Sequence, residues 1–276
     1  MPPIKLIATD IDGTLVSNQG IITERSLRAI RAAQEKGITV AIATGRFPEN
    51  AYMLLEDYGL RLPIIGVNGA RVVDESLREI SSHEMDREAV RQSLNVLLNA
   101  GSDFFIFGDH AICTATKQRK HHSELSHGDR IKDLGFQYYH GKEEVEEFVA
   151  RHAVYKFFVC DNMPLPPIRQ ALSAVPGIDL TQSWYNNIEI MPAGVDKGQG
   201  VRDMARAMGI SMNEVMTLGD QNNDIPMLKA AGWGVAMGNA SEETKSAARF
   251  VTASYAEEGF ALALETYALI AERKDF

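Results

Sequence analysis

The chain has 276 residues, of which 45% are hydrophobic and 24% are charged, and its formal net charge is −9. This length can bury a sizeable core in one or two domains, and the composition excludes disordered and membrane-spanning classes. The acidic balance and the lack of a long basic stripe argue against nucleic acid as a partner.

The N-terminus and the cysteines indicate the compartment. No run of about 18 apolar residues occurs, and Asp10 comes too early for the apolar region of a signal peptide. Cys113 and Cys160 form no CxxC pair, which favours reduced, structural thiols. We therefore expect a cytoplasmic protein with no membrane partner.

The chain begins by alternating short apolar runs with helical patterns. Runs without polar alternation predict strands at residues 4–9, 39–43 and 62–67, each buried on both faces of a sheet. Helices are predicted between them at 23–36 and 47–58. This order predicts a parallel, right-handed, doubly wound sheet.

After Val67 the pattern changes. ARVVDESLREI (70–80) predicts a hairpin. Beyond it, aromatic strands such as FFIF and YKFFV mix with the helix KEEVEEFVARH and a Pro-rich turn, MPLPP, which is typical of an antiparallel sheet with helices on one face. We predict a separate α+β domain at 85–187, inserted into a core formed by 1–84 together with 188–276.

The core pattern resumes near residue 188. Strands are predicted at 215–218 and 233–236, and a helix at 198–208. The predicted fold class is therefore α/β, with a doubly wound, mostly parallel Rossmann-like core sheet and an inserted α+β domain.

Four polar stretches carry the candidate chemistry, and three of them follow predicted core strands. They are DIDGT (10–14), TGR (44–46), GDQNND (219–224) and DKG around Lys197. In an open α/β sheet, ligands bind at the carboxyl edge of the strands. The four stretches therefore bring paired acids, a hydroxyl, an ammonium group and a further acidic cluster to one edge.

These groups suit a cation and a phosphate. Carboxylates bind hard cations, and a carboxylate can also receive a transferred anionic group, for which phosphate is the natural candidate. Mg²⁺ keeps several waters and takes one or two carboxylates, which Asp10 and Asp220 could supply. Acids as close as Asp10 and Asp12 repel each other unless positive charge lies nearby, so a cation is expected here.

Each residue also has an ordinary structural explanation. The turn at 10–12 could be an Asx turn that caps a helix, and Thr44 could be a helix N-cap. Lys197 could be a surface lysine, and it lies outside any Walker loop, which needs glycines before the lysine and Ser or Thr after it. Arg46 suits either an anion or a surface salt bridge.

Together the four stretches resemble the four motifs of the haloacid dehalogenase-like phosphatases. VNGA (67–70), DKG and VAMGNA (235–240) resemble more narrowly the Cof-type subfamily, whose cap domain is inserted after the third strand. About 30 residues separate Asp12 from Thr44, too few for a cap, whereas about 130 separate Val67 from Lys197. The predicted insertion therefore matches that cap in position and size.

The resemblance implies a role for each motif residue. Asp10 would be the nucleophile that becomes an aspartyl phosphate, and Asp12 the general acid and base. Mg²⁺ would be bound by Asp10, Asp220 and the Asp12 backbone carbonyl, with Asp224 orienting Lys197 or a metal water. The groups that hold the phosphoryl oxygens would be Thr44, the amides of Ile11 and Gly45, Asn223 and Lys197, with Arg46 a weaker candidate.

The implied function is a Mg²⁺-dependent phosphatase of small phosphorylated metabolites, with sugar phosphates as the expected class. The alternatives are a phosphomutase or phosphotransferase of the same superfamily, a regulatory module phosphorylated on aspartate, and a binding protein with a dead site. Asp12 in the acid–base position favours turnover over a long-lived phospho-aspartate. The sequence indicates no oligomeric state.

The expected cap adds weaker candidates. Lys117, Arg119 and Lys120 could bind a second anionic group of the substrate or form a solvated face, and the histidines nearby match no zinc spacing. WYNN (184–187), where the cap rejoins the core, could be a hinge, a wall of the site or a packing element.

Overall fold

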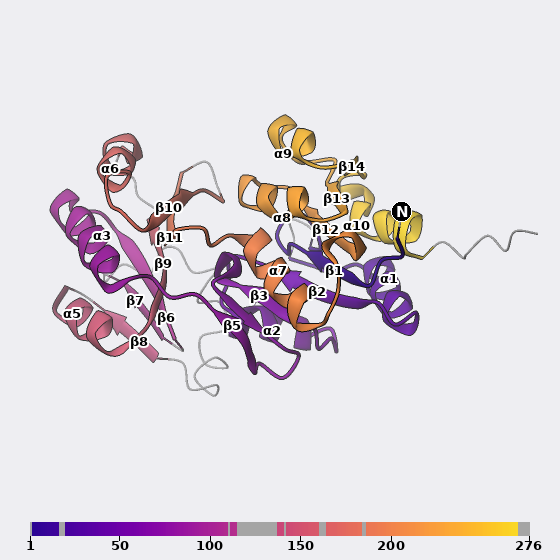
Figure 1. Ribbon diagram of the computed structural model, residues 1–276, viewed down its shortest axis with the longest axis horizontal. Helices are drawn as coiled ribbons and strands as arrows, with labels where there is room; N and C mark the ends of the chain where they lie inside the picture. Colours follow the sequence, from indigo (N-terminus) through magenta and orange to yellow (C-terminus); the bar gives the residue numbers. More distant parts are fainter. Residues whose placement is uncertain are drawn as a thin grey trace, which may run out of the picture.

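The computed structural model describes residues 2–16, 20–109, 111–114, 137–140, 142–159, 164–183 and 186–269. They form two lobes, each built around its own β-sheet (Figure 1). The cap candidates Lys117, Arg119 and Lys120, together with Cys160, Trp184 and Tyr185, lie outside the described residues.

The larger lobe is the core, and its sheet has eight strands in the order β14-β13-β12-β1-β2-β3-β4-β5. From β14 to β3 all neighbours are parallel, and β4 and β5 continue the sheet as an antiparallel hairpin. This confirms the predicted fold class and the hairpin. The strands are β1 (Leu6–Thr9), β2 (Thr39–Ala43), β3 (Ile64–Gly66), β4 (Arg71–Val73), β5 (Glu79–Ser82), β12 (Val215–Gly219), β13 (Trp233–Ala236) and β14 (Phe250–Val251).

Both faces of the core sheet are covered. Side chains of β1 alternate between two apolar clusters: Ile7 shares one with Ile30, and Leu6 shares the other with Met204. Burial on both faces explains why the strand has no polar alternation. The core helices are α1 (Glu24–Glu35), α2 (Pro48–Glu56), α7 (Lys197–Ala207), α8 (Ile225–Ala230), α9 (Glu242–Ala247) and α10 (Gly259–Ala263).

The smaller lobe is the cap, and its sheet has six strands in the order β10-β11-β9-β6-β7-β8. All pairs are antiparallel except β7 with β8. One face packs against three helices through a cluster that includes Leu94, Phe148, Phe157 and Leu172. The elements are α3 (Arg87–Ala100), β6 (Phe104–Gly108), β7 (Ala111–Thr114), β8 (Gln137–His140), α5 (Lys142–Arg151), β9 (Val154–Val159), α6 (Leu165–Leu172), β10 (Ile178–Thr181) and β11 (Ile188–Pro192).

Two sequence expectations for the cap need correction. The sequence predicts that residue 188 begins the second part of the core, but β11 pairs with β10 and β9 inside the cap sheet, so the chain returns to the core after Pro192. Every residue of β11 is buried, and such an apolar run looks the same in either sheet. The Pro-rich segment is also not only a turn, because Pro164 is the N-cap of α6, and Pro166 and Pro167 lie in its first turn, where no amide donor is needed.

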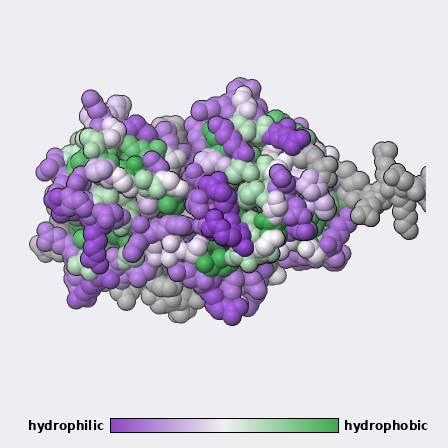
Figure 2. Space-filling view, in the orientation of Figure 1, coloured by the Kyte–Doolittle hydropathy of each residue, from purple (hydrophilic) through white to green (hydrophobic). Residues whose placement is uncertain are grey.

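Apolar surface is limited on the face seen in Figure 2, which is mostly hydrophilic with small separate green patches on both lobes. In the described part of the chain, the large hydrophobic residues that stand exposed are Ile21, Met208, Val251 and Leu262. Among the described residues, no helix has both the length and the apolar character needed to cross a membrane.

Candidate active site

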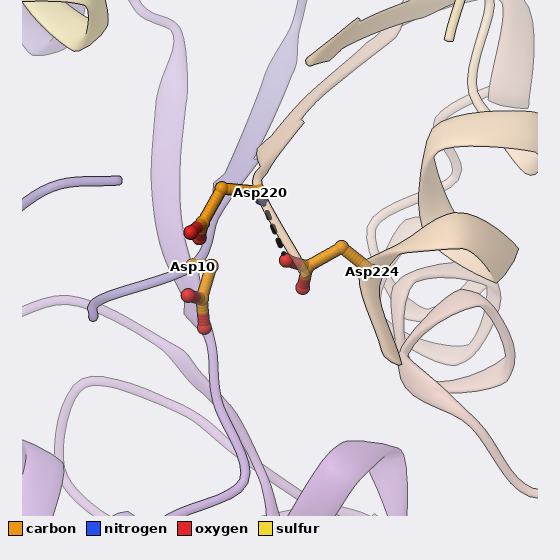
Figure 3. Close-up of side chains that lie close together, drawn as sticks. All are labelled: Asp10, Asp220 and Asp224. Carbon is orange, nitrogen blue, oxygen red and sulfur yellow. Dashed lines mark hydrogen bonds between the residues drawn. The ribbon is translucent and has the colours of Figure 1, made fainter. Parts of the chain in front are cut away.

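Three carboxylates meet at the carboxyl edge of the core sheet. Asp10 follows β1, Asp220 follows β12, and Asp224 ends the short turn Asn222–Asp224. One oxygen from each lies within 4.8 Å of the others, and all three residues are buried (Figure 3). Strands β1 and β12 are neighbours, with Thr9 paired to Leu218, so the sheet brings together acids that lie far apart in the sequence.

Lys197 bridges two of these acids. Its Nζ donates to Asp10 Oδ1 at 2.7 Å and to Asp224 Oδ1 at 2.6 Å, and the side chain is 1% exposed. The residue begins helix α7, where the Asp196 side chain accepts a hydrogen bond from the Gln199 amide as N-cap. The N-cap residue Asp196 therefore fixes the end of α7 that carries the Lys197 ammonium group.

Burial and charge shift the pKa values of this cluster. Burial disfavours the charged form of Lys197, but the carboxylates of Asp10 and Asp224 outweigh it and raise the pKa above its ordinary value. Burial, only partly opposed by Lys197, raises the pKa of Asp10 well above its usual range. Burial and the neighbouring Asp224 raise the pKa of Asp220 to about 6. One ammonium group thus leaves the three acids undercompensated.

The donor set fits a hard cation. Both oxygens of Asp224 are engaged, since Oδ1 accepts from Lys197 and Oδ2 accepts from the amides of Asp220 and Gln221 at 2.9 Å each. Asp224 therefore holds the loop and the lysine, and Asp10 and Asp220 are the carboxylates placed to bind a cation. The buried triad, with its excess negative charge, is a consistent metal site.

A tight turn after β1 brings the backbone against Asp220. Gly13 has a φ of 83°, and a Cβ there would lie 2.5 Å from Asp220 Oδ2. Thr14 Oγ1 donates to Asp220 Oδ1 at 3.1 Å. Asn239 donates to the Gly13 carbonyl at 3.0 Å and to Asp220 Oδ2 at 3.2 Å, a bracing contact that sequence reasoning missed. Glycine at this position is therefore required by both conformation and space.

The two acids of the first motif point to different environments. The Asp10 side chain is buried in the triad, whereas that of Asp12 is 60% exposed. Arg46 donates to both Asp12 oxygens, from Nε at 3.0 Å and from Nη2 at 2.7 Å. This bidentate pair joins the first and second motifs. The repulsion expected between Asp10 and Asp12 is thus reduced, because the two side chains point apart and each has its own positively charged partner. Lys197 pairs with Asp10, and Arg46 pairs with Asp12.

The second motif lies on the strand next to β1. Thr44 follows β2 and is buried, and its Oγ1 accepts from the Arg46 amide at 3.2 Å, so the hydroxyl also stabilises its own turn. The carbonyl of Gly45 accepts from Lys156 Nζ of the cap at 2.7 Å. Ile11, between the two acids of the first motif, is buried. The structure therefore gathers residues of DIDGT (10–14), TGR (44–46) and GDQNND (219–224), together with Lys197, at one edge of the core sheet.

Three polar residues near this edge have no counterpart in the predicted motif roles. They are Asn68, Lys156 and Glu189, and all are buried between the lobes. For Lys156 the signal in the sequence was its position inside the aromatic strand YKFFV, where charge is rare, and Asn68 belongs to VNGA (67–70). Apolar contacts surround them, including a stacked pair of Phe47 and Phe107 with ring centroids 4.7 Å apart across the lobes.

Residues 7–264 match the model of a family described as haloacid dehalogenase-like hydrolase. The chain belongs to this family. The match spans both lobes, and the Cof-type, subclass IIB assignment expected from the motifs and the cap position is confirmed.

Several similar proteins match over nearly their full lengths. The chain is 32% identical to 5-amino-6-(5-phospho-D-ribitylamino)uracil phosphatase YwtE of Bacillus subtilis, over 94% of this chain and 96% of that protein. It is 29% identical to phosphatase YwpJ of the same organism, over 94% and 98%. The solved structure of the subclass IIB sugar phosphatase BT4131 superposes with a TM-score of 0.80 at 27% identity, covering 96% of this chain and all of that one.

Proposed function

We propose that this phosphatase uses Mg²⁺ and an aspartyl phosphate on Asp10 to hydrolyse phosphate monoesters of sugars and related polyols. The observation that carries the proposal is the buried contact of Asp10 with Lys197 at 2.7 Å, beside the second strand-end acid, Asp220. A carboxylate held between an ammonium group and a cation site is placed to attack an anionic phosphoryl group, because both positive charges offset the repulsion.

The reaction has two transfers. In the first, an Asp10 oxygen forms a bond to phosphorus, the bond from phosphorus to the metabolite oxygen breaks, and Asp12 gives that oxygen a proton. In the second, water attacks the phosphorus of the aspartyl phosphate and gives its proton to Asp12. Inorganic phosphate leaves, and the Asp10 carboxylate is restored. Asp12 therefore works as acid and then as base.

Asp12 has the freedom that this double role needs. Its side chain is mostly exposed and is held by Arg46 rather than by the triad. Contact with a leaving group requires Arg46 to release the carboxylate, and an anionic oxygen of the substrate can then accept a hydrogen bond from the guanidinium in its place. The ion pair thus keeps both side chains next to the site until the substrate arrives.

The cation and the phosphoryl group have separate ligands in this scheme. Mg²⁺ would be held by the Asp10 and Asp220 carboxylates and the Asp12 carbonyl, and it would supply charge stabilisation to the transferred group. Lys197 neutralises charge on the same group from the side of helix α7. The remaining phosphoryl contacts are assigned to the Thr44 hydroxyl, the Ile11 and Gly45 amides, and Asn223.

The substrate class is supported by the similar proteins. YwtE is named for a phosphorylated ribityl compound and BT4131 for sugar phosphates, and both substrates are phosphate esters of polyhydroxylated carbon chains. A phosphomutase would use the same first transfer but pass the phosphoryl group to a second hydroxyl. Phosphate release that equals substrate loss supports hydrolysis, and isomerised product without phosphate release would overturn it.

The direct test is the Asp10→Asn variant, assayed with Mg²⁺ and p-nitrophenyl phosphate. We expect kcat to fall by at least about 10³-fold, because the amide is a poor nucleophile and a poor cation ligand. Asp57→Asn, which changes an exposed aspartate after α2 in the same way, is the control and should keep wild-type activity. A folded Asp10→Asn variant with wild-type turnover would refute the nucleophile assignment.

A further inference from the structure

The cap sheet presents two buried charged side chains to the core. Glu189 of β11 is paired with Phe158 of β9, and Lys156 lies two residues before Phe158, so both charges share the sheet face opposite the cap helices. Lys156 is 1% exposed and Glu189 2% exposed. Burying such groups is costly unless they are bonded, so their partners show what the face does.

Glu189 bonds to the core through an asparagine. Its Oε2 accepts a hydrogen bond from Asn68 Nδ2, and its Oε1 accepts from Ser183 Oγ at 2.8 Å. Asn68 Oδ1 in turn accepts from Asn223 Nδ2 at 3.2 Å. The Asn68 backbone has a φ of 52°, a left-handed conformation that asparagine adopts more readily than most residues. A series of hydrogen-bonded side chains therefore runs from the cap sheet to Asn223 in GDQNND (219–224).

Glu189, at the cap end, fixes which group donates and which accepts in each hydrogen bond of this series. An ionised carboxylate only accepts hydrogen bonds, so Asn68 must turn its nitrogen to Glu189 and its oxygen to Asn223. Asn223 must then turn its nitrogen to Asn68. Without the carboxylate, the side-chain amides of Asn68 and Asn223 could both rotate by about 180°, and a hydrogen bond between them would remain with donor and acceptor exchanged. Glu189 is the member that excludes the reversed arrangement.

The orientation of Asn223 bears on phosphate binding. Its Nδ2 carries a second N–H that no described residue accepts, and its Oδ1 is buried without a hydrogen-bond partner in the described part of the chain. Asn223 adjoins Asp224, which accepts a hydrogen bond from Lys197 and lies close to Asp10 and Asp220 (Figure 3). Turning the amide over would exchange the donor and the acceptor, and a carbonyl in place of the N–H would repel a phosphoryl oxygen.

We propose that Glu189 is a positioning residue for phosphoryl transfer: through Asn68 it fixes the Asn223 amide with its N–H available to a phosphoryl oxygen. This inference rests on the proposed function. Glu189 belongs to the cap, whereas Asn68 and Asn223 belong to the core, so the orientation is imposed when the cap lies on the core as it does here. Lys156 reinforces that docking by its bond to the Gly45 carbonyl.

The test exchanges the carboxylate and the amide between positions 189 and 68. Glu189→Gln keeps the shape but allows the amides to turn over, and we expect the inhibition constant of inorganic phosphate to rise and kcat to fall, each about tenfold. Asn68→Asp alone sets two carboxylates face to face and should also impair the enzyme. In the double variant the new glutamine amide donates to the new carboxylate, which can only accept, so the Asn223 orientation is fixed again. Both constants should recover to within about threefold of wild type.

Two controls separate positioning from packing. Asn213→Asp adds the same charge at an exposed site and should leave both constants unchanged. In an Asn223→Ala background, Glu189→Gln should have no further effect on phosphate inhibition, because the amide it orients is gone. An unchanged phosphate constant in Glu189→Gln, an undiminished effect in the Asn223→Ala background, or a lack of rescue would overturn the inference. Loss of turnover in Asp10→Asn tests the proposed function independently.

Discussion

The catalytic edge and the interface between the lobes both bury ionisable side chains, but they compensate charge in different ways. At the edge, three carboxylates face the single ammonium group of Lys197. At the interface, Glu189 and Lys156 lie 3.9 Å apart, and neutral donors and a carbonyl complete their bonding. The undercompensated cluster needs a ligand, whereas the opposite charges of Glu189 and Lys156 balance each other within the protein. Charge imbalance, rather than burial, distinguishes the site from its support.

The largest difference is expected when each region loses its lysine. Lys197→Met leaves Asp10 and Asp224 without their buried partner, and kcat should fall by at least about 10³-fold. Lys156→Met removes a single bond to Gly45 and one side of a longer ion pair, and kcat should fall by less than about tenfold. The measurement is kcat with p-nitrophenyl phosphate at saturating Mg²⁺. Equal losses in the two variants would contradict the comparison.

The pH should act on the cation site. Burial and Asp224 raise the pKa of Asp220 to about 6, so the metal-free protein loses stability as the pH rises from the ordinary value of 3.8 towards 6. Mg²⁺ requires the ionised carboxylate and therefore gains affinity over the same range. We expect calorimetric Mg²⁺ affinity to be about tenfold weaker at pH 5 than at pH 7. The same affinity at both values would show that Asp220 is not a ligand.

A smaller effect on Mg²⁺ affinity is expected from filling the space at Gly13, in the turn after β1. A Cβ at Gly13 would lie 2.5 Å from Asp220 Oδ2, so Gly13→Ala should push this carboxylate away and weaken Mg²⁺ about fivefold. Gly37→Ala is the matched control, because Gly37 also has a positive φ but no atom within 4 Å of an added Cβ. Both variants should lose stability through strain of about 1 kcal/mol, but only Gly13→Ala should change the affinity.

The smallest effect is expected at the exposed ion pair. Arg46→Gln should change the free energy of unfolding by less than about 1 kcal/mol, because Asp12 is largely in solvent. Its KM should rise more clearly than its stability falls, since the guanidinium lies next to the proposed phosphate site. Denaturant unfolding and steady-state kinetics measure the two quantities. A large stability loss with an unchanged KM would assign the pair to structure alone.

Local sequence patterns predicted the core well, because several candidate site residues there lie directly after a strand that the pattern reveals. Asp10, Thr44 and Asp220 each follow a buried strand, and parallel strands bring their carboxyl ends together whatever lies between them. The cap boundary was wrong because β11 is fully buried, and an apolar run does not say which of two sheets it joins. Its position follows from pairing with β9 and β10, which no local window contains.

Side-chain partners between distant segments could not be predicted in the same way. The choice of Asp12 as the partner of Arg46 depends on how β1 and β2 pair, and Asn239 reaches Asp220 only through the turn after β13. Asn68 lies in a stretch that matches a family signature, and Glu189 lies where the core pattern was expected to resume. Neither type of pattern reveals a hydrogen bond between lobes. Such contacts are properties of the assembled tertiary structure.

The central place of β1 in the core sheet has a consequence for biosynthesis. Its pairing partners are β2, made soon afterwards, and β12, whose residues leave the ribosome only after the whole cap has been translated. A nascent chain therefore carries Asp10 on a strand with one open edge until the C-terminal part emerges. Asp10 therefore meets Lys197 and Asp220 only after the second part of the core has been translated.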